Sequence, residues 1–161
     1  MQKTEMIDIG RKRKTPRLAR AQALVRLNKE IINRIKDDTL PKGNVLENAR
    51  VAAIFAAKNT AGIIPLCHNL ELEYVGIDFR LEQDGILVES LVRTTGKTGV
   101  EMEAMVACAT ASLVIYDMCK MFSKAIEIEK IILLEKRGGK SGIYQRKAGY
   151  GKGQDSLDKL Q

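Results

Sequence analysis

Asp117 and Lys120 are three residues apart, a spacing that places both side chains on one face of a helix. A pair of this kind is often an ordinary surface ion pair. However, Asp117 follows the apolar run Ala109–Ile115, so dry surroundings and a shifted pKa are also expected, as for a group that handles protons. The spacing leaves both interpretations open.

Two further acids, Glu101 and Glu103, do not form a paired-carboxylate site, because residues two apart on a helix face about 200° apart. Thr98 and Glu101 predict a capping box at a helix start. Glu103 has no such structural role at the edge of an otherwise apolar helix. Glu103 and Asp117 are separated by about 21 Å along that helix. They therefore serve different ends of a long ligand, or sites built with neighbouring subunits.

The single histidine, His68, follows Cys67 in the segment Pro65–Asn69 between a predicted helix and a predicted strand. A titratable imidazole in a loop is a candidate binding or proton-transfer group. A histidine packed at a turn explains the same pattern. A nucleophilic Cys–His pair is disfavoured, because neighbouring side chains on an extended segment point apart.

Two segments, Thr95–Gly99 and Gly139–Gly142, contain the Gly-Lys-Ser/Thr sequence of phosphate loops. Neither is a Walker A loop, because Leu91 and Leu134 stand where that loop needs its first glycine. Lys97 beside a helix start and Lys140 between glycines remain candidate phosphate-binding residues. Solvated turn lysines are the alternative.

The charge balance favours an anionic partner. The chain has 161 residues, with 27 Lys and Arg against 20 Asp and Glu, and a formal net charge of +7. Three cysteines (Cys67, Cys108, Cys119) are too few for a disulfide framework, and one histidine argues against a metal site. We expect neither a metal nor a cofactor.

The chain is expected to be a cytoplasmic protein with no membrane partner. Its most apolar stretch, Ala104–Ile115, is shorter than the about 20 residues that span a bilayer. The first ten residues lack the charged start and apolar run of a secretory signal.

Hydrophobic periodicity predicts the elements that must position these residues. Strands are expected at Leu18–Leu27, Leu72–Glu82, Ile86–Arg93 and Ile126–Leu134, and long helices at Val45–Lys58 and Val100–Phe122, with a helical turn near Asn28–Lys36. Asp84-Gly85 predicts a hairpin turn, and Lys130 predicts a bulge in the last strand.

This order of elements predicts an α+β, ferredoxin-like fold: an antiparallel four-stranded sheet with two long helices packed on one face. The other sheet face needs cover, which an oligomer can supply. We expect one catalytic domain over 1–144, with a mobile basic segment at 1–16, and a polar, flexible tail at 145–161.

Four blocks of this sequence resemble the signature blocks of the molybdenum cofactor biosynthesis protein C family, the cyclic pyranopterin monophosphate synthases. They are Pro65–His68, Thr95–Ala104, Ile115–Lys120 and Gly138–Gly142. Met6–Ile9 and Lys42-Gly43 also fit, so the resemblance covers about residues 6–142.

The resemblance implies a lyase that converts (8S)-3′,8-cyclo-7,8-dihydroguanosine 5′-triphosphate to cyclic pyranopterin monophosphate and releases diphosphate. It implies a homohexamer, a trimer of dimers, with its active site at a subunit interface. The positions that match substrate-binding motifs are Leu66, Cys67, His68, Met102 and Glu103. Asp117 matches the residue usually assigned as active site, and Lys42 and Lys120 match lysines assigned to acid–base work.

The sequence departs from the family pattern at three positions: Asn44 replaces a common Asp, Asn69 a usual Pro, and Arg137 a small residue. The main alternative is a ferredoxin-like nucleotide- or RNA-binding module without activity. RNA-binding sheets present aromatic side chains that stack on bases. Only Tyr74 and Phe79 lie in the predicted strands, so we expect no nucleic-acid partner.

Overall fold

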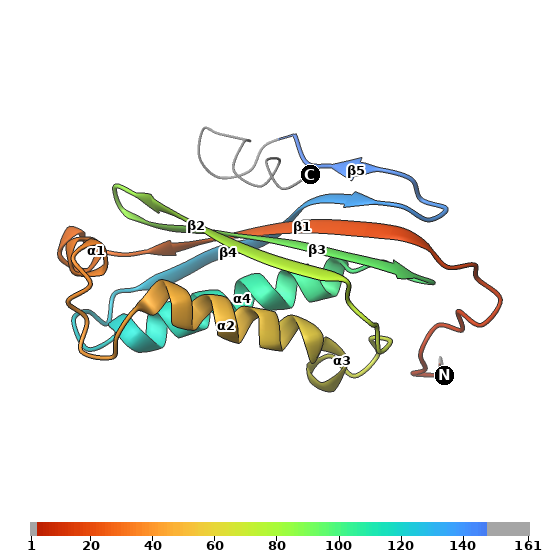
Figure 1. Ribbon diagram of the computed structural model, residues 1–161, viewed down its shortest axis with the longest axis horizontal. Helices are drawn as coiled ribbons and strands as arrows, with labels where there is room; N and C mark the ends of the chain where they lie inside the picture. The colour runs from red at the N-terminus through yellow and green to blue at the C-terminus, as the bar shows by residue number, and fades with distance from the viewer. Residues whose placement is uncertain (1–2, 148–161) are drawn as a thin grey trace.

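The computed structural model describes residues 3–147 and has an α+β fold (Figure 1). In chain order its elements are β1 (Thr15–Arg26), α1 (Lys29–Lys36), α2 (Val45–Lys58), α3 (Thr60–Ile63), β2 (Tyr74–Glu82), β3 (Gly85–Gly96), α4 (Glu101–Cys119), β4 (Glu127–Arg137) and β5 (Tyr144–Gln145). The two long helices, α2 and α4, lie side by side on one face of the sheet.

The sheet is antiparallel, with the strand order β2-β3-β1-β4-β5. The first four strands have the expected ferredoxin-like arrangement, which confirms the prediction from the order of elements. The sheet has five strands and not the predicted four, because Tyr144 and Gln145 pair with Lys136 and Glu135 of β4. A two-residue strand carries no periodicity that sequence reasoning can detect.

Strand β1 supplies small side chains to the face that carries the helices. Ala19, Ala21 and Ala23 are fully buried there. Opposite them on β3, Ser90 donates a hydrogen bond from Oγ to the carbonyl oxygen of Ala104 in α4, at 2.8 Å. The alanines therefore let α4 approach the sheet closely, and this contact fixes the position of its first turns.

The start of α4 differs from the prediction. The predicted capping box is wrong: Val100 is the N-cap, no side chain caps the helix, and Glu101 is its first residue. Strand β3 continues to Gly96, so Thr98 lies in a short connection. Glu101 instead forms an ion pair with Lys136 of β4, with Oε1 3.2 Å from Nζ.

The predicted bulge is confirmed, and the structure also explains the replacement at Asn44. Lys130 has a φ of 33° and lies where the pairing of β1 with β4 shifts register, so it forms the expected bulge. Asn44 caps α2 by accepting a hydrogen bond from the backbone N–H of Glu47 at 3.0 Å. Because Asp and Asn are equally good caps, the replacement at this position leaves the helix start intact.

Helix α4 joins the two ends of the molecule. Its start lies near α3 and the N-terminal segment, and its end lies near α1 and the loop that precedes α2 (Figure 1). By length and composition α4 could cross a membrane, but more than half of its apolar stretch is buried, as in a core helix of a soluble protein.

The predicted boundary between 1–144 and 145–161 stays a prediction. Gln145 pairs with Glu135, and residues 148–161 of the predicted tail lie outside the described residues.

Candidate functional site

Lys42, Asp117 and Lys120 meet at the end of α4. The Asp117 carboxylate accepts a hydrogen bond from Lys42 Nζ at 2.7 Å on Oδ2 and from Lys120 Nζ at 2.6 Å on Oδ1. Lys42 Nζ also donates to the backbone carbonyl oxygen of Asp117 at 3.0 Å. Gly43, with a φ of 87°, makes the turn between Lys42 and the cap of α2. We call these three residues the lysine cluster.

The two ammonium groups decide the charge state of Asp117. Hydrogen bonds from Lys120 and then Lys42 lower the pKa of Asp117 to about 2. The same contact with Asp117 raises the pKa of Lys120. The side chain of Asp117 is 55% exposed, so the expectation of dry surroundings is wrong. Asp117 lies on the exposed side of α4 with Leu113, although the next two residues, Met118 and Cys119, are buried. Its pKa therefore shifts through ion pairing and not through burial.

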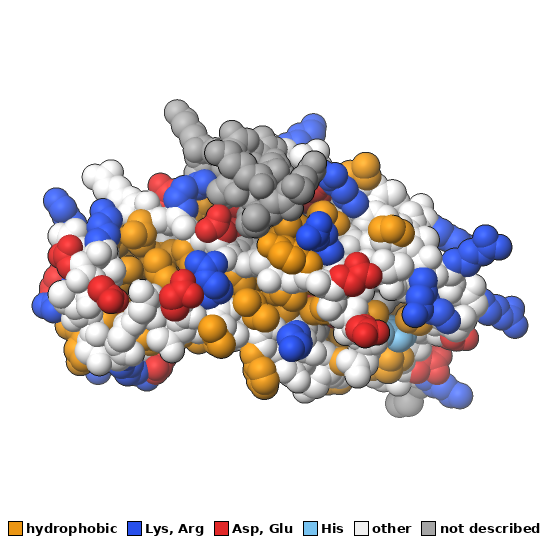
Figure 2. Space-filling view, in the orientation of Figure 1, with side chains coloured by type: hydrophobic (Ala, Val, Ile, Leu, Met, Phe, Trp, Pro, Cys, Tyr) orange, Lys and Arg blue, Asp and Glu red, His pale blue; other side chains and the backbone are white. Residues whose placement is uncertain are grey.

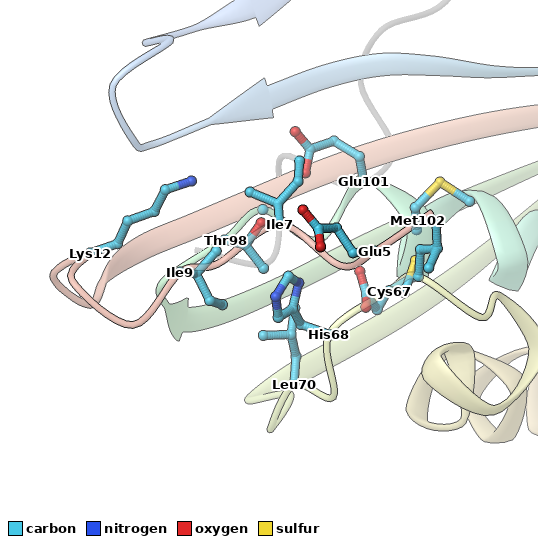
Figure 3. A pocket seen from close by; sticks show the side chains of 13 residues that line it. Glu5, Ile7, Ile9, Lys12, Cys67, His68, Leu70, Thr98, Glu101 and Met102 are labelled. Atoms are coloured by element: carbon cyan, nitrogen blue, oxygen red, sulfur yellow. The ribbon is translucent and has the colours of Figure 1, made fainter. Parts of the chain in front are cut away.

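A cavity of about 510 Å³ lies at the other end of α4 (Figure 3). All five residues predicted to bind substrate line it: Leu66, Cys67, His68, Met102 and Glu103. Leu66–His68 come from the loop after α3, and Met102 and Glu103 from the first turn of α4. We call this cavity the α4 pocket.

The N-terminal segment forms one wall of the α4 pocket, which sequence reasoning missed. Glu5, Ile7 and Ile9 line it in alternation, as expected for an extended segment that turns every second side chain one way (Figure 3). The backbone N–H of Gly10 donates to Asp8 Oδ1 at 2.7 Å, which closes a tight turn after this wall. The alternation of Ile7 and Ile9 with polar Asp8 and Gly10 was the sequence signal that could have predicted this wall.

Glu103 is the buried acid of this pocket, with only 4% of its surface exposed. The pKa of Glu103 is raised to about 7, mainly by burial; a backbone hydrogen bond lowers it in part, and the charge of Glu101 adds a smaller increase. Burial and the charge of Glu103 in turn raise the pKa of the Cys67 thiol. Cys67 is therefore held as a thiol and is unsuited to act as a nucleophile.

A second cavity, of about 880 Å³, is lined by seven cationic side chains and one carboxylate. The cations are Arg11, Lys12, Arg13, Arg17, Lys97, Lys136 and Lys140, and the carboxylate is Glu101. We call it the cationic pocket. Lys and Arg side chains project from this end of the molecule (Figure 2). It shares Lys12 and the segment from Thr98 to Glu101 with the α4 pocket, so the two cavities adjoin.

The cationic pocket contains both lysines predicted from the Gly-Lys-Ser/Thr segments, Lys97 and Lys140. Lys97 Nζ donates to the carbonyl oxygen of Gly10 at 2.8 Å, which ties the N-terminal segment to the pocket. Sequence reasoning did not assign Arg17, Lys136 or the run Arg11–Arg13 to the site. The basic run itself was the available signal for the last of these.

Lys42 lies apart from these two pockets, in the lysine cluster with Asp117. Lys42 and His68 therefore lie at opposite ends of α4 and do not share one side of a site within the chain. The described residues contain no group of three His, Cys, Asp or Glu side chains that could hold a metal ion.

Comparison with known proteins identifies the family of this chain. A model of the MoaC family matches residues 6–139. The chain belongs to the MoaC family. A cyclic pyranopterin monophosphate synthase of Peptoclostridium acidaminophilum is 44% identical over 146 residues, which cover 91% of this chain and 93% of that protein. The synthase of Bordetella pertussis is 50% identical over 142 residues, covering 87% and 88%.

A longer MoaC relative is also similar. A molybdenum cofactor biosynthesis bifunctional protein of Synechococcus elongatus is 52% identical over 145 residues, which cover 89% of this chain and 46% of that protein. This chain thus matches about half of that bifunctional protein.

In this MoaC chain, the Gly138-Gly139 segment approaches β1 too closely to allow a side chain. Gly138 has a φ of 97°, and a Cβ there would overlap the carbonyl oxygen of Pro16. A Cβ at Gly139, which has a φ of 78°, would overlap the guanidinium of Arg17. The two glycines therefore position Lys140 beside Arg17 in the cationic pocket.

Gly138→Ala is expected to lower the free energy of unfolding by about 2–3 kcal/mol, because the clash with backbone adds to the cost of positive φ. Gly142→Ala is the matched control, since Gly142 has a φ of 64° with open space around it. It should cost only about 1 kcal/mol. Urea unfolding of both variants measures the difference, and equal losses would show that the contact with Pro16 is unimportant.

Proposed function

We propose that this protein is a cyclic pyranopterin monophosphate synthase in molybdenum cofactor biosynthesis. It is a lyase that converts (8S)-3′,8-cyclo-7,8-dihydroguanosine 5′-triphosphate to cyclic pyranopterin monophosphate and releases diphosphate. The adjoining α4 and cationic pockets carry this proposal, because together they match a ligand with a ring system at one end and a triphosphate at the other.

The cationic pocket suits the triphosphate. Seven cations against one carboxylate give a strongly positive cavity that attracts a multiply charged anion. When diphosphate leaves, negative charge accumulates on it, and positioned Lys and Arg groups stabilise that charge. Lys97 and Lys140 are the proposed phosphate contacts, supported by Arg17.

The α4 pocket suits the ring system. Leu66, Met102 and Ile9 provide apolar surface, and Cys67, His68 and Glu103 provide polar groups that can orient the ring edges. We assign Leu66, Cys67, His68, Met102 and Glu103 to substrate binding.

The lysine cluster supplies acid–base chemistry. Opening a purine-derived ring needs positioned proton donors and acceptors. Asp117 holds Lys120 protonated, so Lys120 enters the reaction as a proton donor. Lys42 donates two hydrogen bonds to Asp117, which hold its ammonium group at the same carboxylate as that of Lys120. Asp117 orients both lysines, and all three residues are assigned to catalysis.

The complete site is built from two chains. Glu103 and Asp117 lie at opposite ends of α4, about 21 Å apart by the rise of a helix. The helix layer exposes large apolar side chains: Val51, Phe55 and Leu113 are more than half exposed. Hydrophobic side chains interrupt the charged surface over the middle of the molecule (Figure 2). A second copy packed antiparallel on this layer brings its lysine cluster to the α4 pocket, in a homohexamer built as a trimer of dimers.

A nucleic-acid-binding role receives no support from the aromatic side chains of the sheet. The guanidinium of Arg93 lies 4.5 Å from the ring centroid of Tyr74, and that of Arg50 lies 5.2 Å from the ring of Phe79. Each ring thus already carries an arginine over one face, where a base would otherwise stack. The partner is a small molecule, and we place the reaction in the cytoplasm, where the three free cysteines stay reduced.

The proposed activity is tested by incubating the purified protein with the cyclic dihydroguanosine triphosphate and measuring diphosphate. We expect stoichiometric release of diphosphate and formation of cyclic pyranopterin monophosphate, detected by mass. GTP, which lacks the bond between the sugar and the base carbon, is the control and should release none. Binding of the cyclic triphosphate without any diphosphate would reject the proposed function.

A further inference from the structure

Glu103 is a buried acid that faces the ligand cavity without a cationic partner. It lies in the first turn of α4, is 4% exposed and lines the α4 pocket. Among residues 3–147 it forms no ion pair, and its carboxylate receives a hydrogen bond only from its own backbone N–H. Removing an unpaired carboxylate from water is costly, and such a group takes up a proton instead.

Most of the nearby cations are occupied elsewhere. Lys136 pairs with Glu101 at 3.2 Å, and Lys97 donates to the carbonyl oxygen of Gly10 at 2.8 Å. In the proposed dimer, the lysines that a second copy brings to the α4 pocket, Lys42 and Lys120, are both held by their own Asp117. The titratable groups that line the pocket with Glu103 are Glu5, Lys12, Cys67, His68 and Glu101, so its one cation, Lys12, faces two further carboxylates that oppose a negative charge on Glu103.

We propose that Glu103 meets the ligand as a neutral carboxyl group and donates its proton in a hydrogen bond to an acceptor atom of the ring system. The identity of the ligand rests on the proposed function. The neutral state of the carboxyl group is inferred separately, from its burial and from the absence of an ion-pair partner among the described residues. A neutral carboxyl group offers one donor and one acceptor, whereas a carboxylate only accepts. Glu103 therefore selects a ring edge that presents an acceptor.

The consequence is a ligand affinity that falls as Glu103 ionises. With a pKa of about 7, most Glu103 is neutral at pH 6 and only about a tenth is neutral at pH 8. Binding through the neutral form then weakens by about tenfold over this range. Glutamine has nearly the same shape, stays neutral and donates an N–H, so Glu103→Gln should remove this dependence.

The test measures the dissociation constant of GTP, an unreactive probe, by calorimetry between pH 6 and pH 8. The wild-type constant should rise about tenfold more than that of Glu103→Gln, which corrects for ionisation of the probe's phosphates. Glu103→Ala should bind weakly at every pH. Parallel pH curves for the wild-type and Glu103→Gln proteins would overturn the proposal. Oligomer mass and circular dichroism confirm that the variants fold.

Infrared spectroscopy of the ligand-free protein tests the carboxyl group separately from the reaction. The difference spectrum of wild type minus Glu103→Gln should show the C=O stretch of a protonated carboxyl at pH 6, and this band should fade by pH 8.5. A carboxylate band at pH 6 would reject the neutral group even if diphosphate is released. A protonated band without diphosphate release would reject the proposed function and leave the state of Glu103 intact.

Discussion

Replacing Lys42 or Lys120 with alanine is expected to slow turnover of the cyclic dihydroguanosine triphosphate by about 10²–10⁴-fold, the usual contribution of a general acid or base. Both ammonium groups contact one carboxylate, so each change removes a positioned proton donor and leaves the α4 and cationic pockets intact. Single-turnover assays of diphosphate release at saturating substrate measure the loss, and the dissociation constant should change little.

Lys124→Ala is the matched control, because Lys124 is an exposed lysine just beyond the same helix and should leave turnover unchanged. Asp117→Asn keeps the shape of the carboxylate and removes its charge, so it should fold, assemble and lose turnover with the lysine variants. Normal turnover with weakened binding in Lys42→Ala and Lys120→Ala would make these lysines phosphate contacts.

The pH dependence of this reaction does not originate in Asp117. The pKa of Asp117 is lowered to about 2, so its negative charge is present above that range and is lost only as the pH falls through about 2. We assign to Glu103, whose pKa is raised into the interval between pH 6 and pH 8, the part of any loss of binding there that Glu103→Gln removes. Two lysines thus lower the pKa of one acid, and burial raises the pKa of the other.

The fold could be predicted because its signals are local. Ala19, Ala21 and Ala23 alternate with Arg20 and Gln22 along β1, and this period of two arises because the alanines pack on the sheet face that lies under the helices. The β2–β3 hairpin also lies where Asp84-Gly85 predicts it, although its two turn residues are Gln83 and Asp84, and Gly85 already pairs with Glu82 as the first residue of β3. The four-stranded order follows from these elements and the rule that helices cover one face.

The site was harder to predict because its contacts are not local. Lys42 and Asp117 are 75 residues apart, and no periodicity shows that the loop before α2 reaches the end of α4. Spacing correctly paired Asp117 with Lys120, since both lie on one helix face. It could not show that Asp117 lies in solvent, because exposure depends on which side of α4 the sheet and α2 cover, and Met118 and Cys119 just after it are buried.

Two positions at the cationic pocket show the same limit. Thr98 and Glu101 have the spacing of a capping box, but β3 continues to Gly96 and leaves Thr98 outside the helix. Glu101 instead forms an ion pair with Lys136, a residue of β4 that is distant in sequence. A contact between distant elements can thus replace the local contact that a sequence motif predicts.

The position of Lys42 sharpens the case for a site shared between subunits. Lys42, Asp117 and Lys120 form one unit at the end of α4, and His68 and Glu103 belong to the pocket at its start. If the reaction needs both units, a single chain cannot supply them to one small centre across about 21 Å. Each site must then combine the pocket of one chain with the lysine cluster of its partner.

Mixing inactive His68→Ala protein with inactive Lys120→Ala protein, under conditions that exchange subunits, is expected to restore activity. In a mixed dimer one site combines the intact pocket of the Lys120→Ala chain with the intact lysine cluster of the His68→Ala chain. With random exchange about a quarter of all sites are complete. A mixture of Lys42→Ala with Lys120→Ala is the matched control and should stay inactive, because both changes affect the same cluster. Mass spectrometry confirms exchange, and an inactive first mixture of exchanged subunits would refute the shared site.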